Sequence, residues 1–236
     1  MLKQEKKHMS CLKKLNKFKE IDVFEIRNLR YKDILYIERM NIRKGITTSI
    51  TGRSGSGKTT LLKMLNKMIS PDEGTILYEK KPVKNIDSLD LRRRVVMLPQ
   101  SPVIFPGDIR DNLLKGLRFS EKPDAPDSRM NEIISELHLN KSLDDDISQL
   151  SGGEKQRIAL ARVILMDPEV YLLDEPSSAL DEETEKTMID FLVKHSRINK
   201  KTLIMVTHSK KIASEYSDEI AEIEHGRLVK SGRVDT

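Results

Sequence analysis

The sequence has no tryptophan, a single cysteine and no long apolar run. The lone Cys11 cannot form an internal disulfide, which fits a reducing cytoplasm. A membrane-spanning helix needs about 18 or more consecutive apolar residues, and no run approaches that length. The lysine-rich start has no apolar core ahead of a small-residue cleavage site, so it is not a secretory signal. We therefore expect a cytoplasmic protein that does not itself cross a bilayer.

The net charge of +5 belongs to one end of the chain. Residues 1–20 carry seven lysines and two glutamates, so the rest of the chain is balanced in charge. Without a basic face over its body, the protein is not expected to bind nucleic acid. We interpret residues 1–20 as a basic, solvated extension, and an amphipathic segment on an anionic membrane surface is the alternative.

The first part of the body alternates as β-strands do. The runs at 23–26, 34–37 and 46–50 predict an antiparallel β layer that leads into a strand ending at Gly52. After that strand, apolar residues at helical spacing over 61–69 predict a helix that stops at Ser70-Pro71-Asp72.

The second part predicts an α/β body interrupted by helices. We expect a helical subdomain of about 108–165, inserted into a domain that covers 21–236. Strands at 170–173 and 202–206, with a helix at 182–195 between them, favour a parallel sheet with crossover helices. A hairpin around His225-Gly226 ends the pattern. No internal repeat or coiled-coil heptad is present.

Residues 52–59, with the sequence GRSGSGKT, match the phosphate-binding P-loop pattern between a strand and a helix. The glycines permit a tight loop whose N–H groups converge on phosphates, and the helix N-terminus adds partial positive charge. Lys58 is expected to reach the β- and γ-phosphates, and the Thr59 hydroxyl to bind magnesium.

An apolar strand pattern ends in two carboxylates, Asp174 and Glu175. Beside a P-loop, Asp174 is expected to hold magnesium through water, and Glu175 to polarise the attacking water. The alternative for Glu175 is a plain capping carboxylate before Pro176.

Residues 150–157, with the sequence LSGGEKQR, predict a second phosphate site. Ser151 is placed as a helix cap, and Gly152 and Gly153 allow an anion to approach closely. Because the chain already has a P-loop, this site makes sense if it serves the nucleotide of another subunit.

These motifs, in this order, resemble the nucleotide-binding domain of ATP-binding-cassette (ABC) transporters over residues 21–230. The resemblance identifies residues 150–157 with the family signature and Gln100 with the glutamine that touches magnesium and the attacking water. It places residues 178–181 in the loop that crosses to the opposite site. It implies that His208 contacts the γ-phosphate and that Tyr31 stacks on adenine, where a core tyrosine is the alternative.

The resemblance implies ATP and Mg²⁺ as cofactors. Its catalytic set is Lys58, Gln100, Glu175 and His208, and its metal set is Thr59, Gln100 and Asp174. Its nucleotide-binding set is Tyr31, Gly52, Arg53, Ser54, Gly55, Ser56, Gly57, Lys58, Thr59, Thr60, Ser151, Gly152, Gly153 and Asp181.

The implied partners are a second copy of the chain, in an ATP-dependent dimer, and a separate integral membrane subunit at the cytoplasmic face of the cell membrane. The chain is most similar to small bacterial ATPase subunits of iron- or metal-exporting systems. An importer ATPase for amino acids or phosphate is one alternative. A soluble relative, of the iron–sulfur-assembly or DNA-repair type, is another.

Overall fold

The computed structural model describes residues 21–178 and 180–234, so the extension at 1–20, with Cys11, lies outside the described residues. The strands are β1 (Asp22–Tyr31), β2 (Leu35–Arg43), β3 (Thr47–Thr51), β4 (Glu73–Tyr78), β5 (Lys81–Pro82), β6 (Val95–Leu98), β7 (Val170–Asp174), β8 (Thr202–Val206), β9 (Glu219–Glu224) and β10 (Arg227–Arg233). The α-helices are α2 (Lys58–Leu65), α3 (Ser88–Arg94), α4 (Ile109–Phe119), α5 (Asp127–Glu136), α6 (Gly152–Leu165), α7 (Glu182–Ile198) and α8 (Lys210–Tyr216).

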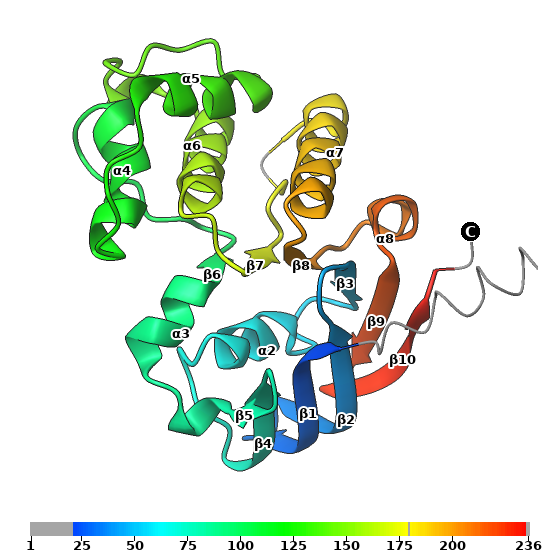
Figure 1. Ribbon diagram of the computed structural model, residues 1–236. Coiled ribbons are helices and arrows are strands. Elements are labelled where there is room, and N and C mark those ends of the chain that lie inside the picture. Colours follow the sequence, from blue (N-terminus) through cyan, green and yellow to red (C-terminus); the bar gives the residue numbers. More distant parts are fainter. Residues whose placement is uncertain (1–20, 179, 235–236) are drawn as a thin grey trace, which may run out of the picture.

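Two sheets form the body of the molecule (Figure 1). The antiparallel sheet has the order β2-β1-β4-β5, and the larger sheet has the order β10-β9-β3-β8-β7-β6. In the larger sheet, the strands from β9 to β6 are parallel, and β10 is antiparallel to β9. The predicted α/β fold class, a parallel sheet with an antiparallel β layer and added helices, is therefore confirmed.

The central strands of the larger sheet, β3, β8 and β7, are buried on both faces, as their apolar residues require, whereas the edge strand β10 is largely exposed. All residues of β7 and β8 are buried. Val170 and Leu172 face a core shared with α2 and the antiparallel sheet. Tyr171 and Leu173 face the opposite core, shared with α6 and α7. This alternation follows from the two-residue period of a strand, and it holds α2 between the two sheets.

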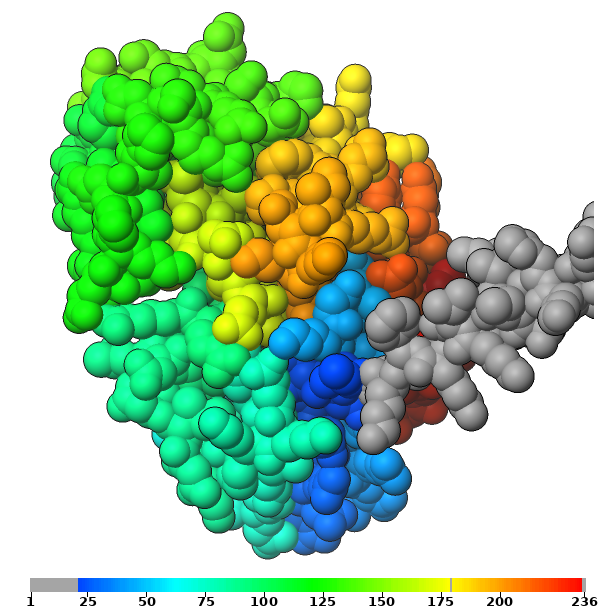
Figure 2. Space-filling view, in the orientation of Figure 1, coloured from blue at the N-terminus to red at the C-terminus, as the bar shows by residue number. Residues whose placement is uncertain are grey.

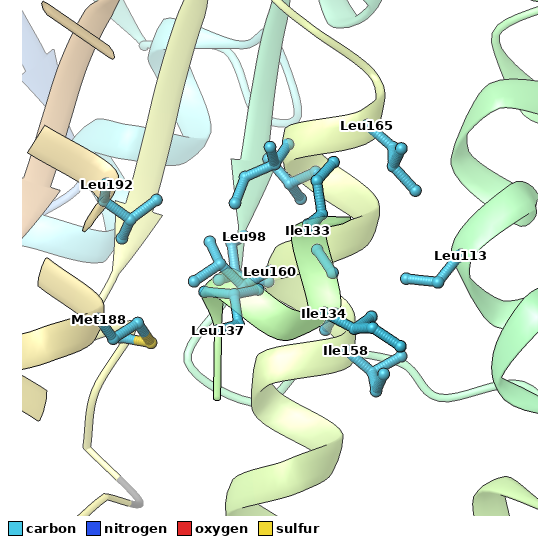
Figure 3. Packing of buried hydrophobic residues seen from close by; sticks show 14 of the residues in the cluster. Leu98, Leu113, Ile133, Ile134, Leu137, Ile158, Leu160, Leu165, Met188 and Leu192 are labelled. Atoms are coloured by element: carbon cyan, nitrogen blue, oxygen red, sulfur yellow. The ribbon is translucent and has the colours of Figure 1, made fainter. Parts of the chain in front are cut away.

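Helices α4 and α5 form the helical part of the molecule, and both contact α6. Figure 3 shows the packing around α6, which involves Leu98, Leu113, Ile133, Ile134, Leu137, Ile158, Leu160, Leu165, Met188 and Leu192. Helix α6 also contacts β6, so it joins the helical part to the sheet. In Figure 2, the green surface of the helical part stands at one end, and the blue-to-cyan surface of the antiparallel layer stands at the other.

The predicted end of the first helix was wrong, because α2 ends at Leu65 and not at Ser70. Lys67 has a φ of 57° and its N–H donates to Met64 O, while Met68 N–H donates to Lys63 O. These two bonds form a Schellman C-cap, which usually has glycine at the left-handed position. Lysine at that position hid the stop signal, and Met68 is 54% exposed as a result.

Candidate functional site

The P-loop lies between the buried strand β3 and the N-terminus of α2. Gly52 has a φ of 141°, and a Cβ there would lie 2.0 Å from Ile223 O, so only glycine fits. Gly57 caps α2 with a φ of 98° and without a side-chain hydrogen bond. Among the described residues, nothing hydrogen-bonds the buried Ser56 hydroxyl. The helix N-terminus is therefore left for an anion.

Lys58 folds back over this loop and is 5% exposed. Its ammonium donates to Gly52 O at 2.9 Å and to Arg53 O at 2.8 Å. Burial lowers the pKa of Lys58, and the nearby charges of Glu175 and Asp174 oppose that shift. A buried ammonium held by neutral carbonyls would gain from a phosphate beside it, because charge-assisted hydrogen bonds are the stronger ones.

Thr59 and Asp174 form the part of the site that fits a cation. The Thr59 hydroxyl donates to Asp174 Oδ1 at 3.0 Å, and Asp174 is 2% exposed. Burial raises the pKa of Asp174, with the bond from Thr59 opposing it. A buried carboxylate with a raised pKa, next to a hydroxyl oxygen, is a donor set that Mg²⁺ would neutralise. The predicted metal residues Thr59 and Asp174 therefore fit Mg²⁺.

The Glu175 carboxylate is held from two sides. Gln100 Nε2 donates to Glu175 Oε2 at 2.8 Å, and His208 Nε2 lies 2.5 Å from Glu175 Oε1. These residues follow β6, β7 and β8, which are neighbours in the sheet. Because the carboxyl ends of parallel strands share one edge, the fold brings the three side chains together beside the P-loop.

The turn between β1 and β2 packs on the P-loop. A Cβ at Gly57 would lie 2.6 Å from Leu35 Cδ2 and 3.2 Å from Ile34 O. Tyr31 pairs with Leu35 in the sheet register, and Lys32 Nζ lies 5.2 Å from its ring centroid. Tyr31 is half-buried and packs against the core between the antiparallel sheet and α2, as the alternative of a core tyrosine requires. Its stacking on adenine stays a prediction.

Tyr36, the other tyrosine of this turn, is already stacked. Arg227 lies 4.4 Å and Arg30 4.9 Å from its ring centroid. Both tyrosines therefore have a cation over the ring, two guanidinium groups at Tyr36 and one ammonium at Tyr31.

The signature residues lie apart from this cluster, at the start of α6. Ser151 accepts a bond from Glu154 N–H at 3.3 Å, and Glu154 Oε2 accepts from Ser151 N–H at 2.8 Å, so the predicted cap is a full capping box. A Cβ at the exposed Gly152 would meet nothing within 4 Å. Ser151 and Gly152 thus lie at an open, capped helix start. The predicted binding of a phosphate by Ser151, Gly152 and Gly153 stays a prediction.

Asp181, which was predicted to contact nucleotide, is the N-cap of α7. Its carboxylate accepts from Thr184 N–H at 3.0 Å and from Thr184 Oγ1 at 2.7 Å. These bonds hold the pKa of Asp181 below its usual range. Within this chain its oxygens are engaged in capping.

Two polar residues of α6, the buried Gln156 and the half-buried Arg162, were not among the predicted site residues. Gln156 Nε2 donates to Pro176 O at 2.9 Å. Arg162 Nε donates to Asn112 O at 2.7 Å, and Arg162 also donates to Val103 O at 2.9 Å, in the segment after Gln100. Burial lowers the pKa of Arg162 to about 10. A polar residue at an apolar helix position was the available signal for both.

A family model described as "ABC transporter" matches residues 38–178. The chain is 36% identical to ABC transporter I family member 17 of Arabidopsis thaliana, over 81% of this chain and 73% of the relative. This chain belongs to the ABC transporter family. Its body is the ABC ATPase domain of that family, as the motifs predicted.

Other relatives are longer proteins. The chain is 38% identical to the transport/processing ATP-binding protein MesD of Leuconostoc mesenteroides, over 84% of this chain and 28% of that protein. It is 33% identical to the methionine import ATP-binding protein MetN 1 of Listeria monocytogenes, over 83% of this chain and 59% of that protein. The ABC ATPase thus spans less than two thirds of these two relatives.

A solved structure has the same fold. The structure of cbiO1 from Clostridium perfringens, described as part of the ABC transporter complex cbiONQ, matches with a TM-score of 0.77 and 27% identity, over 91% of this chain and 89% of that chain. Within residues 21–178 and 180–234, no helix is long and apolar enough to span a bilayer.

Proposed function

We propose that this ABC ATPase binds and hydrolyses MgATP at composite sites between two copies of the chain, and that hydrolysis drives transport through a separate integral membrane subunit. The observation that supports this most is the position of the Glu175 carboxylate. It lies between Gln100 and His208, at the same sheet edge as Lys58 and the Thr59–Asp174 pair.

Each predicted site residue has a distinct role in this mechanism. Lys58 exchanges its carbonyl partners for the β- and γ-phosphates, and the N-terminus of α2 adds partial positive charge. Mg²⁺ bound by Thr59, Asp174 and the Gln100 amide oxygen would neutralise charge on the phosphates. Glu175 polarises the attacking water, and His208 contacts the γ-phosphate and holds the carboxylate in place.

The second copy supplies what the first copy lacks. Ser151 and Gly152 are exposed at the capped start of α6, and Gly153 is half-buried beside them. We expect these three residues to bind phosphate of the partner's nucleotide. A head-to-tail dimer places this helix start over the partner's nucleotide, so that ATP binding closes the dimer and hydrolysis reopens it.

A test of the catalytic role compares Glu175→Gln with the wild type. The amide cannot accept a proton, so kcat is expected to fall by about 100-fold or more, while ATP still binds. A phosphate-release assay measures this change. Hydrolysis by Glu175→Gln at the wild-type rate would remove Glu175 from the mechanism.

Transport is supported by relatives that are named for transport and for methionine import. These names favour a transport role over an iron–sulfur-assembly or DNA-repair type of ATPase. They include an importer, so export of iron or another metal stays a prediction. We place the ATPase at the cytoplasmic face of the membrane, held there by its membrane subunit.

The partner can be identified by pull-down of Glu175→Gln from detergent-solubilised native membranes with ATP present. Slow hydrolysis keeps the closed dimer and its partner together. Recovery of an integral membrane protein is the expected result. Recovery of only soluble assembly factors or nucleic acid would contradict the transport role and leave the ATPase chemistry intact.

A further inference from the structure

Gln156 is a buried glutamine that the mechanism above does not use. Its side chain lies on α6, and the residue is 5% exposed. Its amide nitrogen donates to Pro176 O at 2.9 Å and lies 3.5 Å from Glu175 O, at the limit for a hydrogen bond. Both neighbours are carbonyl oxygens, so the amide nitrogen must be the atom that faces them. The side chain is therefore directed at the backbone that carries the catalytic carboxylate.

That backbone has an unusual conformation. Glu175 has a φ of 49°, which is uncommon for a residue with a long side chain. It also precedes a proline, where extended backbone is preferred. A conformation of this kind persists only where the surrounding structure fixes it.

Hydrogen bonds from several elements hold the backbone around Glu175 in this conformation. Glu175 N–H donates to Val206 O of β8 at 3.1 Å, and Ser178 N–H donates to Glu175 O at 3.2 Å. Ser177 Oγ donates to Glu185 Oε1 of α7 at 2.5 Å. Gln156 adds the bond from α6. The direction of the Glu175 side chain, between Gln100 and His208, depends on this backbone.

We propose that Gln156 is a positioning residue, which holds the Glu175 carboxylate at the ATP site through the Glu175–Pro176 backbone. The proposal rests on the proposed role of Glu175. Gln156 follows Ser151 by five positions in the same helix region. The helix that is proposed to bind the partner's nucleotide therefore also holds this chain's own catalytic carboxylate.

The first test is Gln156→Met in the full chain. Methionine has a similar length and a high helix propensity, but it cannot donate the bond. We expect kcat to fall by about 10- to 100-fold, because a small misplacement of a catalytic group has an effect of that size. The KM for ATP is expected to stay within about twofold, because among the described residues the Gln156 side chain hydrogen-bonds the 175–176 backbone and not the P-loop.

The matched control is Ile164→Val on the same helix, where the residue is 1% exposed. This change removes a buried methylene group and lowers the melting temperature, but it is expected to leave kcat unchanged. If Gln156→Met lowers kcat only as Ile164→Val does, Gln156 is a structural residue and the proposal is wrong.

The second test combines Gln156→Met with Glu175→Gln and measures single-turnover hydrolysis. A residue that acts through Glu175 adds no further loss when the carboxylate is gone. A further loss of about tenfold or more in the double variant would contradict the proposal. Should Gln156→Met fail to fold, Gln156→Ala serves in both tests, because alanine removes the donor without burying a charge and the same kcat loss is expected.

The same assay separates two failures. If Glu175→Gln hydrolyses ATP like the wild type, the proposed function fails, and this inference fails with it. If Glu175→Gln is slow and Gln156→Met matches the wild type, only the role of Gln156 is overturned.

Discussion

We propose that two helix starts of the chain bind phosphate, and these starts differ in which of their backbone donors are already satisfied by the chain's own residues. At α2, Gly57 gives no side-chain cap, the first turn has no acidic residue, and Lys58 lies buried. At α6, Ser151 and Glu154 complete a capping box, and Glu154 lies in the first turn.

From this difference we predict which half of the site binds ATP first. The start of α2 has uncompensated donors and a buried ammonium, so it has the most to gain from ATP within a single chain. The start of α6 is already capped and partly neutralised, so it adds contacts to a nucleotide that another chain holds. Binding at the P-loop and closure by the signature are therefore expected to be separable by mutation.

The largest expected effect is at the P-loop. Lys58→Met removes the ammonium beside the phosphates and is expected to weaken ATP binding by about 100-fold, the equivalent of about 3 kcal/mol of charge-assisted hydrogen bonding. Hydrolysis is expected to be lost. Calorimetry with MgATP and a phosphate-release assay measure the two effects.

Lys67→Met is the matched control. The Lys67 ammonium also donates to two carbonyls, Lys84 O at 3.1 Å and Ile86 O at 2.5 Å, but away from the P-loop. ATP binding by Lys67→Met is expected to match the wild type. An equal loss in both variants would mean that the effect of Lys58→Met is not specific to phosphate.

The next effect is at the signature. Gly152→Asp is expected to fold normally, because a Cβ there meets nothing within 4 Å and an acidic residue suits a helix start. Its carboxylate would repel the partner's phosphate, so hydrolysis is expected to fall by about 10- to 100-fold. ATP binding by the single chain is expected to stay within about twofold of wild type.

Gly232→Asp is the control for Gly152→Asp, because a Cβ at Gly232 also meets nothing within 4 Å. It introduces the same charge at another open position and is expected to leave hydrolysis unchanged. Equal loss of ATP binding and hydrolysis in Gly152→Asp would break the comparison between the two helix starts.

The smallest effects are on stability without nucleotide or metal, and they have opposite signs. The raised pKa of Asp174 means that its ionisation destabilises the fold as pH rises through the folded-state pKa, so Asp174→Asn is expected to raise the melting temperature at neutral pH. Bonds from Ser151 lower the pKa of Glu154, so its stabilisation is present above the ordinary pKa and lost as pH falls through the folded-state pKa. Glu154→Gln is expected to lower the melting temperature at neutral pH.

Differential scanning calorimetry in EDTA measures both changes, which we expect to be a few degrees and to shrink towards acid. A shift of the same sign in both variants would contradict the contrast between the buried Asp174 carboxylate beside α2 and the capping Glu154 carboxylate at the start of α6.

Sequence reasoning reached the site through motifs whose spacing is tied to chemistry. The P-loop, Asp174, Glu175 and the cap of α6 could be predicted because glycines, strand ends and capping residues are local signals. The family resemblance supplied Gln100 and His208 as site residues, but their meeting with Glu175 depends on the order of β6, β7 and β8, which only the structure gives.

Other features had no local signal. Strands β4 and β6 are short and polar or flanked by charge, so their pairing depends on distant strands. The end of α2 was missed because Lys67 takes the place of glycine in its cap. The role of Gln156 needed the φ of Glu175, which no sequence pattern gives.

The most direct test of a composite site is the solution mass of Glu175→Gln, by light scattering, with and without MgATP. One chain has a mass of 27.1 kDa. The account predicts that MgATP doubles the mass of Glu175→Gln and does not change that of Glu175→Gln combined with Gly152→Asp. The contradicting result is a wild-type chain that binds and hydrolyses MgATP, together with a Glu175→Gln variant that keeps the mass of a single chain at saturating MgATP.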